Sequence, residues 1–224
     1  MNKVFEFLNL IKDNNNREWF QENKDTYDEV YERMNLIANQ ILYEMNQHDL
    51  IETATGKKSL YRIYRDVRFS KDKTPYKSNW SGGFKRATAQ KRGGYYYHIE
   101  PGGSYLAGGF WGPNKDDLKL IREHLAQDSS EYRKIINSKD FKLTFDIVLG
   151  EKLKKCPKGF DIEHPDIDLL RHKQFVLKYN LTDKVVLSDS FPRITSEIFK
   201  KMRPYFNLMS EYLTTDSNGI EIYA

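Results

Sequence analysis

The chain has 224 residues, of which 30% are charged and 39% hydrophobic, a balance typical of a folded globular protein. Its single cysteine excludes an internal disulfide and any metal site built from several cysteines. No apolar run reaches the length of a membrane span, and Glu6 would interrupt the apolar part of a signal peptide. We therefore expect a cytoplasmic protein with no membrane partner.

Residues 1–55 are predicted to be helical. Apolar residues at helical spacing predict a first helix over residues 2–12 and a long amphipathic helix over residues 17–47. Three asparagines at 14–16 separate the two and offer a side-chain cap for the second helix. A further break at residues 24–26 also fits the pattern.

Residues 60–112 form the predicted β-rich core. Nine of the thirteen glycines lie between residues 82 and 112, mostly as Gly-Gly pairs. Strand patterns over residues 76–84, 95–100 and 105–110 alternate with these pairs, and a Pro-Gly-Gly turn joins the last two strands. With residues 60–69 as a further strand, the sequence predicts an antiparallel sheet of at least four strands.

After residue 113 helical patterns predominate. Asn114 is expected to cap the first of these helices, and Pro204 to kink the last. Because no repeat or linker interrupts the chain, we predict one α+β domain over residues 1–224, with the antiparallel sheet packed against several helices. The predicted segments are helices over 114–125, 129–138, 164–173 and 188–213, strands over 174–179 and 219–223, and a strand or a helix over 141–149.

The positive charge of the chain is concentrated in one stretch. Residues 60–77, hereafter the basic segment, carry six basic and two acidic residues, and the rest of the chain carries thirty of each. The whole net charge of +4 therefore lies in the basic segment. Such a concentration favours a site for an anion. The basic residues are Arg62, Arg65, Arg68, Lys71, Lys73 and Lys77, and the acids are Asp66 and Asp72.

Read as a strand, the basic segment alternates between an apolar and a charged face. Arg65 is an exception, because it falls on the apolar face. A buried guanidinium needs a carboxylate partner, so we expect Arg65 to be largely buried and paired with Asp66 or with an acid from a packed helix. The residues predicted to face a core are Tyr61, Ile63, Val67 and Phe69.

Our first hypothesis is an anion pocket for a small phosphorylated or carboxylated ligand, in a binding protein or an enzyme. The alternative is a non-enzymatic module for nucleic acid or an acidic protein, because aromatic residues stand among the cations and aromatics stack on bases. A third reading is a structural network of ion pairs that fixes the fold. The predicted ligand-binding residues are Arg62, Arg65, Arg68, Lys73, Tyr76 and Lys77, and the aromatics of the nucleic-acid reading are Tyr61, Tyr64, Tyr76 and Trp80.

His98 and Asp66 are the candidate catalytic residues. Tyr96, His98 and Glu100 share one face of a predicted strand, and a histidine beside a carboxylate can shuttle protons. Asp66 would orient the arginines around it. A histidine that is only hydrogen-bonded within a sheet is the commoner case. No nucleotide, dinucleotide, zinc-protease or hydrolase motif is present, so we predict no cofactor and no metal. The sequence leaves open whether the protein is an enzyme.

Residues 65–77 resemble the signature of a bacterial and fungal family of unknown function, domain of unknown function 2461. The resemblance covers nearly the full chain and implies a single cytoplasmic α+β domain. The family has no established activity, so no catalytic residue is implied. The stretch Phe110-Trp111-Gly112 is bulkier than the family pattern. Supporting blocks are residues 14–20, 94–104 with Gly109, 157–160, His164-Pro165 and 170–173.

Overall fold

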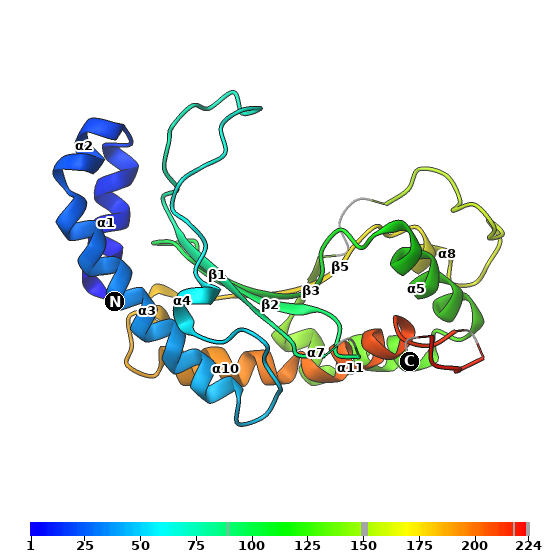
Figure 1. Cartoon of the computed structure of the whole chain (residues 1–224). Coiled ribbons are helices and arrows are strands. Elements are labelled where there is room, and N and C mark those ends of the chain that lie inside the picture. Colours follow the sequence, from blue (N-terminus) through cyan, green and yellow to red (C-terminus); the bar gives the residue numbers. More distant parts are fainter. Residues whose placement is uncertain (89, 149–151, 217, 223–224) are drawn as a thin grey trace. The chain divides into compact units, whose positions relative to one another are not determined.

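A computed structural model describes residues 1–88, 90–148, 152–216 and 218–222 (Figure 1). The helices are α1 (Asn2–Asp13), α2 (Arg17–Glu22), α3 (Lys24–Met45), α4 (Gly56–Ser59), α5 (Lys115–Gln127), α6 (Ser130–Asn137), α7 (Lys139–Thr144), α8 (Ile167–Leu170), α9 (Asp183–Val186), α10 (Phe191–Lys201) and α11 (Arg203–Tyr212). The strands are β1 (Trp80–Lys85), β2 (Gly94–Ile99), β3 (Tyr105–Phe110), β4 (Asp146–Val148) and β5 (Phe175–Asn180).

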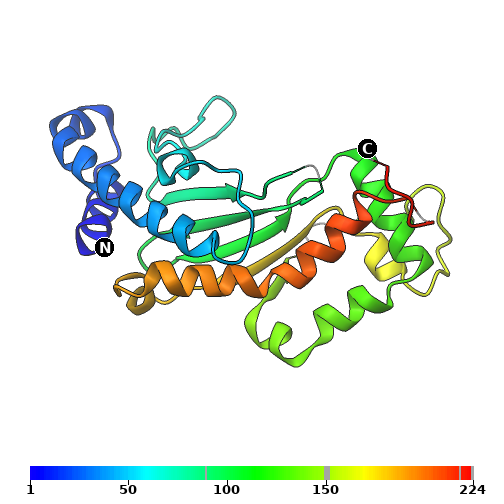
Figure 2. The same ribbon diagram turned by 60° about the horizontal axis from the view of Figure 1, so that its bottom comes forward.

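The predicted α+β class is confirmed. The strands form one sheet in the order β1-β2-β3-β5-β4, and β4 pairs with β5 in the antiparallel sense. Figure 2 shows β1, β2 and β3 side by side. Within the described ranges, no helix combines the length and the apolar character that crossing a bilayer requires.

The chain divides into two compact units, and the first contains the basic segment. This unit comprises residues 1–84, 96–106 and 180–198. Its N-terminal helices begin and end at asparagines: the Asn16 side chain accepts the backbone N–H of Trp19 at 2.9 Å, and α2 ends at Asn23. The apolar side of α3 covers β1, where Trp80 stacks on Tyr27 with 5.7 Å between ring centroids.

The second unit comprises residues 85–95, 107–179 and 199–224. Tyr95 of β2 packs between Phe199 and Phe206, each 4.9 Å away between ring centroids. Gly108 of β3 lies directly under α11, because a Cβ atom there would come within 2.8 Å of the Phe206 ring. The close approach of helix to sheet therefore requires glycine at this position. A single domain over residues 1–224 stays a prediction.

Most predicted segments are confirmed, and the long helical patterns divide where the sequence indicated a break. Residues 17–47 split into α2 and α3 at Asn23, and residues 188–213 split into α10 and α11 at Met202. The ambiguous stretch 141–149 contains the end of α7 and then β4, and its Leu149 lies outside the described residues. The prediction of a last strand over 219–223 is wrong for its described residues 219–222, where Glu221 makes only an isolated bridge to Thr215. The prediction of a regular strand over residues 60–69 is wrong, for the reason given below.

Gly82 allows the start of the basic segment to pack closely against β1. Leu60 pairs with Gly82 of β1 through an antiparallel bridge. A Cβ atom on Gly82 would lie 2.6 Å from the Ser59 carbonyl oxygen and would clash with the Tyr97 hydroxyl. The side chain of Tyr97 is fully buried, so it has little room to move.

We therefore expect Gly82→Ala to destabilise the protein by about 1–3 kcal/mol, a fall of several degrees in Tm by differential scanning calorimetry. Gly103→Ala is the matched control, because the nearest atom to its Cβ would be the end of the flexible Glu100 side chain at 3.3 Å. Equal Tm values for Gly82→Ala and wild type would contradict this packing.

Candidate functional site: the basic segment and the sheet cluster

The basic segment is an irregular hairpin that extends away from β1 (the teal loop in Figure 1). Asn15 fixes its base, since the side-chain amide donates to the Tyr76 carbonyl at 2.9 Å and accepts the Tyr76 N–H at 3.0 Å. The Tyr76 ring is buried and stacks on Phe20 at 4.0 Å. Three backbone hydrogen bonds hold the two strands of the hairpin and its base. The N–H groups of Tyr61, Lys77 and Arg65 donate to the carbonyl groups of Ser81, Ile63 and Pro75, respectively.

The tip of the hairpin is held by its own side chains. Asp72 accepts the backbone N–H of Thr74 at 2.9 Å, which closes the turn at the tip. Arg65 donates to Asp72 at 2.5 Å and to the Thr74 carbonyl at 3.1 Å. The ammonium of Lys73 donates to the Val67 carbonyl at 2.9 Å. The pairing therefore sets the shape of the turn.

Arg65 is paired, but the predicted partner was wrong. Its carboxylate is Asp72 of the same turn, and neither Asp66 nor a helix supplies one. The side chain is 26% exposed, so the guanidinium is only half-buried. The Thr74 backbone N–H and then the Arg65 guanidinium lower the pKa of Asp72 to about 2.

Asp66 is engaged by its neighbour Arg68. The guanidinium binds both carboxylate oxygens, with Nε to Oδ1 at 2.9 Å and Nη2 to Oδ2 at 2.7 Å. This hydrogen bonding lowers the pKa of Asp66 below its usual range, so the group is an ionised acceptor at neutral pH. A catalytic role for Asp66 stays a prediction.

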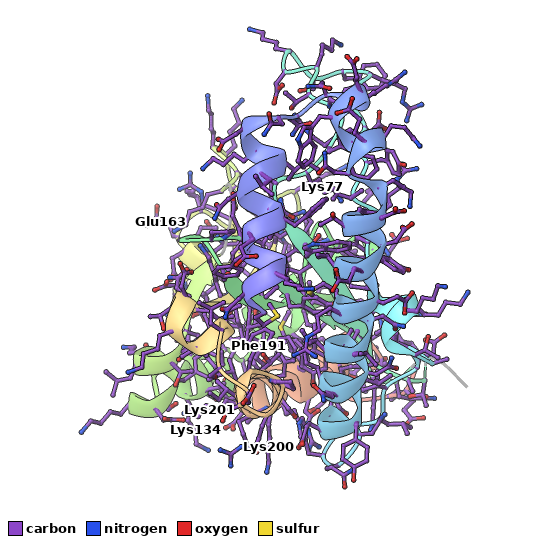
Figure 3. All side chains as sticks on the ribbon, turned by 90° about the vertical axis from the view of Figure 1, so that its left-hand side faces the viewer. Lys77, Lys134, Glu163, Phe191, Lys200 and Lys201 are labelled. Atoms are coloured by element: carbon purple, nitrogen blue, oxygen red, sulfur yellow. The ribbon has the colours of Figure 1, made fainter. Side chains whose placement is uncertain are left out.

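Four cations remain without a carboxylate partner. Within the described ranges no salt bridge involves Arg62, Lys71, Lys73 or Lys77, and their four charges equal the net charge of the whole chain. Arg62 and Lys77 lie on the two opposite strands of the hairpin base, which are joined where the Lys77 N–H donates to the Ile63 carbonyl at 2.8 Å. Burial and the nearby charge of Arg62 lower the pKa of Lys77. Figure 3 labels Lys77 below the loop at the top of the view.

The aromatic residues of this region divide into two groups, which sequence reasoning did not separate. Ile63 is buried as predicted, but Tyr61 is 50% exposed and Phe69 is 96% exposed, so their predicted place in a core is wrong. The predicted strand does not form: Leu60 and Tyr64 make only isolated bridges, to Gly82 and to Tyr76, with a bend at Ile63 between them. After Arg65 the chain enters the turn held by Asp72, and no further alternation of faces follows. Tyr64 is also half-exposed. Two aromatics of the nucleic-acid reading, Tyr76 and Trp80, are buried.

Beside the hairpin base lies a hydrogen-bonded group, the sheet cluster, formed by Tyr96, His98, Glu100 and Tyr105. Nε2 of His98 lies 3.0 Å from the Glu100 carboxylate, and Nδ1 lies 3.2 Å from the Tyr96 hydroxyl. The His98 ring stacks on Tyr105 at 4.6 Å. Tyr61 of the basic segment contacts Tyr96, with 6.1 Å between ring centroids.

The sheet cluster can relay a proton. Burial raises the pKa of Tyr96 to about 12, so the hydroxyl keeps its proton at neutral pH. The tautomer of His98 decides which of its two ring nitrogens donates, to Tyr96 or to Glu100. Catalysis by His98 stays a prediction. In the described part of the chain, no three His, Cys, Asp or Glu residues gather as ligands for a metal ion.

The comparison with known families agrees with the resemblance seen in the sequence. Residues 3–207 match the family described as conserved hypothetical protein (DUF2461), and this match includes both the basic segment and the sheet cluster. The chain belongs to this family. No curated protein and no solved structure matches the chain. The description of DUF2461 names no activity, so a function has to be argued from the geometry.

The pairing at the hairpin tip predicts how Asp72 titrates. Its pKa in the folded protein, about 2, is lower than the value near 3.9 of an unfolded chain. The turn therefore gains stability above about pH 4 and loses it as the pH falls through about 2. Arg65→Met should raise the pKa of Asp72 in an NMR titration, but not to its value in an unfolded chain, because the Thr74 N–H still donates to the carboxylate.

Arg68→Met is the control for this titration. It should raise the pKa of Asp66 and leave that of Asp72 unchanged, because each arginine binds its own carboxylate. An unchanged pKa of Asp72 in Arg65→Met would show that the Arg65–Asp72 pair does not form in solution.

Proposed function

We propose that the protein binds phosphate-bearing ligands through the basic segment. The observation that supports this most is the set of four cations without a carboxylate partner on one short hairpin: Arg62, Lys71, Lys73 and Lys77. Like charges held together raise the free energy of the folded protein, and a bound anion lowers it again. A cytoplasmic location belongs to this proposal.

Arg62 and Lys77 form the centre of the proposed contact. Both are cationic, they lie on the two opposite strands of the hairpin base, and burial and then the charge of Arg62 lower the pKa of Lys77. A phosphate has several acceptor oxygens and two negative charges near neutral pH, so it can accept hydrogen bonds from a guanidinium and an ammonium at once. Binding would thus restore the pKa of Lys77 toward its usual value.

The remaining residues of the basic segment have different parts in this proposal. Arg65 and Arg68 are held by Asp72 and Asp66, which supports the structural reading for these two ion pairs. Both arginines retain donors that the carboxylates do not use, so they can add to a contact that the unpaired cations begin. Tyr76 is buried under Phe20, and its role is to hold the hairpin in place.

A second candidate function is chemical conversion of the bound ligand, supported by the hydrogen-bonded series from Tyr96 through His98 to Glu100. A general acid or base needs a proton path of this kind. The test is release of inorganic phosphate from a panel of phosphate esters, compared between wild type and His98→Asn. Equal release by the two proteins would exclude His98 from any such reaction.

Binding itself is tested with inorganic pyrophosphate. At a hundred times its Kd, a ligand stabilises the folded protein by about 2.7 kcal/mol, so we expect pyrophosphate to raise the Tm of wild type by several degrees. The double variant Arg62→Ala with Lys77→Ala should show no such rise, because it lacks both central cations.

Lys12→Ala with Lys58→Ala is the matched control, since it removes the same charge from two exposed residues of the first unit. It should respond to pyrophosphate like wild type. An equal rise in Tm for all three proteins would place the anion elsewhere, and no rise in any of them would leave the ion pairs as purely structural.

A further inference from the structure

We propose that the ligand is a single-stranded nucleic acid, whose phosphates contact the unpaired cations of the basic segment while one of its bases stacks on Phe69. This inference rests on the phosphate binding proposed above and names its ligand class.

Phe69 is the first observation. Its side chain is 96% exposed, more than any other large hydrophobic side chain that the structure describes. The ring lies at the tip of the hairpin, and the Arg68 guanidinium carbon is 5.9 Å from its centroid. An aromatic ring in water gives up the free energy that burial would provide, so this position favours a partner that covers the ring.

The second observation is that further exposed rings occur along the same hairpin. Tyr61 and Tyr64 are each about half-exposed. Their other faces are held by protein, Tyr61 against Tyr96 and Tyr64 against Tyr76. A ring whose one face is held by protein contacts can stack on a base with its other face, because stacking then costs little side-chain entropy. The three exposed rings thus occur one after another along the chain of the hairpin, from its base to its tip, and we call this series the row.

The cations are interleaved with these rings. Arg62 stands between Tyr61 and Tyr64, and Lys71 and Lys73 follow Phe69. At about 3.3 Å per extended residue, the stretch from Tyr61 to Phe69 spans at most roughly 26 Å. One mononucleotide cannot reach along such a row. Several linked nucleotides can, because their phosphates and bases alternate as the cations and rings do.

The row favours a single strand over a duplex or a membrane. The bases of a duplex are stacked on each other, so their faces are not available to three separate rings, whereas those of a single strand are. An anionic membrane surface would contact the tip of the hairpin, but it would leave Tyr61 and Tyr64 near the base exposed to water. The exposure of all three rings is therefore accounted for by the single strand.

The test measures binding of a fluorescein-labelled twelve-residue oligothymidylate to the full chain by anisotropy at several salt concentrations. If four phosphates are neutralised, the logarithm of Kd should rise with the logarithm of salt concentration with a slope of about 3, at about 0.7 per phosphate. Thymidine monophosphate should bind more weakly and give a slope of about 1 or less. The duplex of the same sequence should also bind more weakly.

Variants of Phe69 separate stacking from simple apolar contact. Phe69→Leu should weaken oligonucleotide binding roughly tenfold, because leucine has no ring to stack on a base, while Phe69→Trp should bind at least as tightly as wild type. Leu143→Ala is the matched control, since Leu143 is also highly exposed but lies on α7; its Kd should equal that of wild type. Since the side chain of Phe69 has almost no contacts, both of its variants should keep the wild-type Tm.

The nucleic-acid proposal is overturned if the oligonucleotide binds no more tightly than thymidine monophosphate while pyrophosphate still binds through Arg62 and Lys77. In that case the proposed phosphate binding remains without the nucleic acid. If no anion binds, both proposals are overturned. Equal binding of duplex and single strand, or an unchanged Kd for Phe69→Leu, would exclude base stacking. Binding to vesicles of phosphatidylserine that survives Phe69→Leu, with no binding of oligonucleotide, would instead assign the hairpin to a membrane surface.

Discussion

The fixed position of Tyr76 is the constraint on which the proposed site depends. Its backbone is paired with the Asn15 side chain as it would be with a neighbouring strand, and its ring is stacked on Phe20. A hairpin with few ladder hydrogen bonds is marginally stable alone in water. Here Asn15 and Phe20 of the N-terminal helical region supply the contacts that the ladder lacks. Arg62 and Lys77 are thus held on the two opposite strands of the base, although their charges repel.

The hairpin also shows how a strongly charged segment folds without a core of its own. Two of its cations are neutralised by acids two and seven residues away, at Asp66 and Asp72. Both carboxylates are exposed, and ion pairs in contact with water contribute little to global stability. Their effect is local, because they fix the turn and hold two guanidinium groups in place. The remaining cations have no carboxylate partner in the described part of the chain, although Lys73 donates to the Val67 carbonyl and Lys77 is partly buried. The proposed anion would supply the missing negative charge.

The sequence predicted the regular elements well and the hairpin poorly. The asparagine cap at residues 14–16 and the strand over residues 105–110 follow from local chemistry that neighbouring residues decide. The exposure of Phe69 does not follow from such local chemistry. Its predicted place on an apolar face assumed that the alternation of a strand continued beyond Arg65. The pairing of Arg65 with Asp72 depends on a turn, which the periodicity of apolar residues does not report. Sequence could locate the charge, but not which cations would stay unpaired.

The sheet cluster and the hairpin are connected through Tyr61, and this connection bears on whether the site performs chemistry. In the structure both ring nitrogens of His98 are engaged, by Tyr96 and by Glu100, and Tyr105 covers one face of the ring. A histidine held in this way stiffens the surface on which Tyr61 rests. To act on a ligand, His98 would have to exchange Tyr96 for a ligand atom. A base stacked on the exposed face of Tyr61 would have the Tyr61 ring between it and Tyr96. Binding at the hairpin would therefore reach His98 only through these two rings, by moving Tyr61 and with it Tyr96.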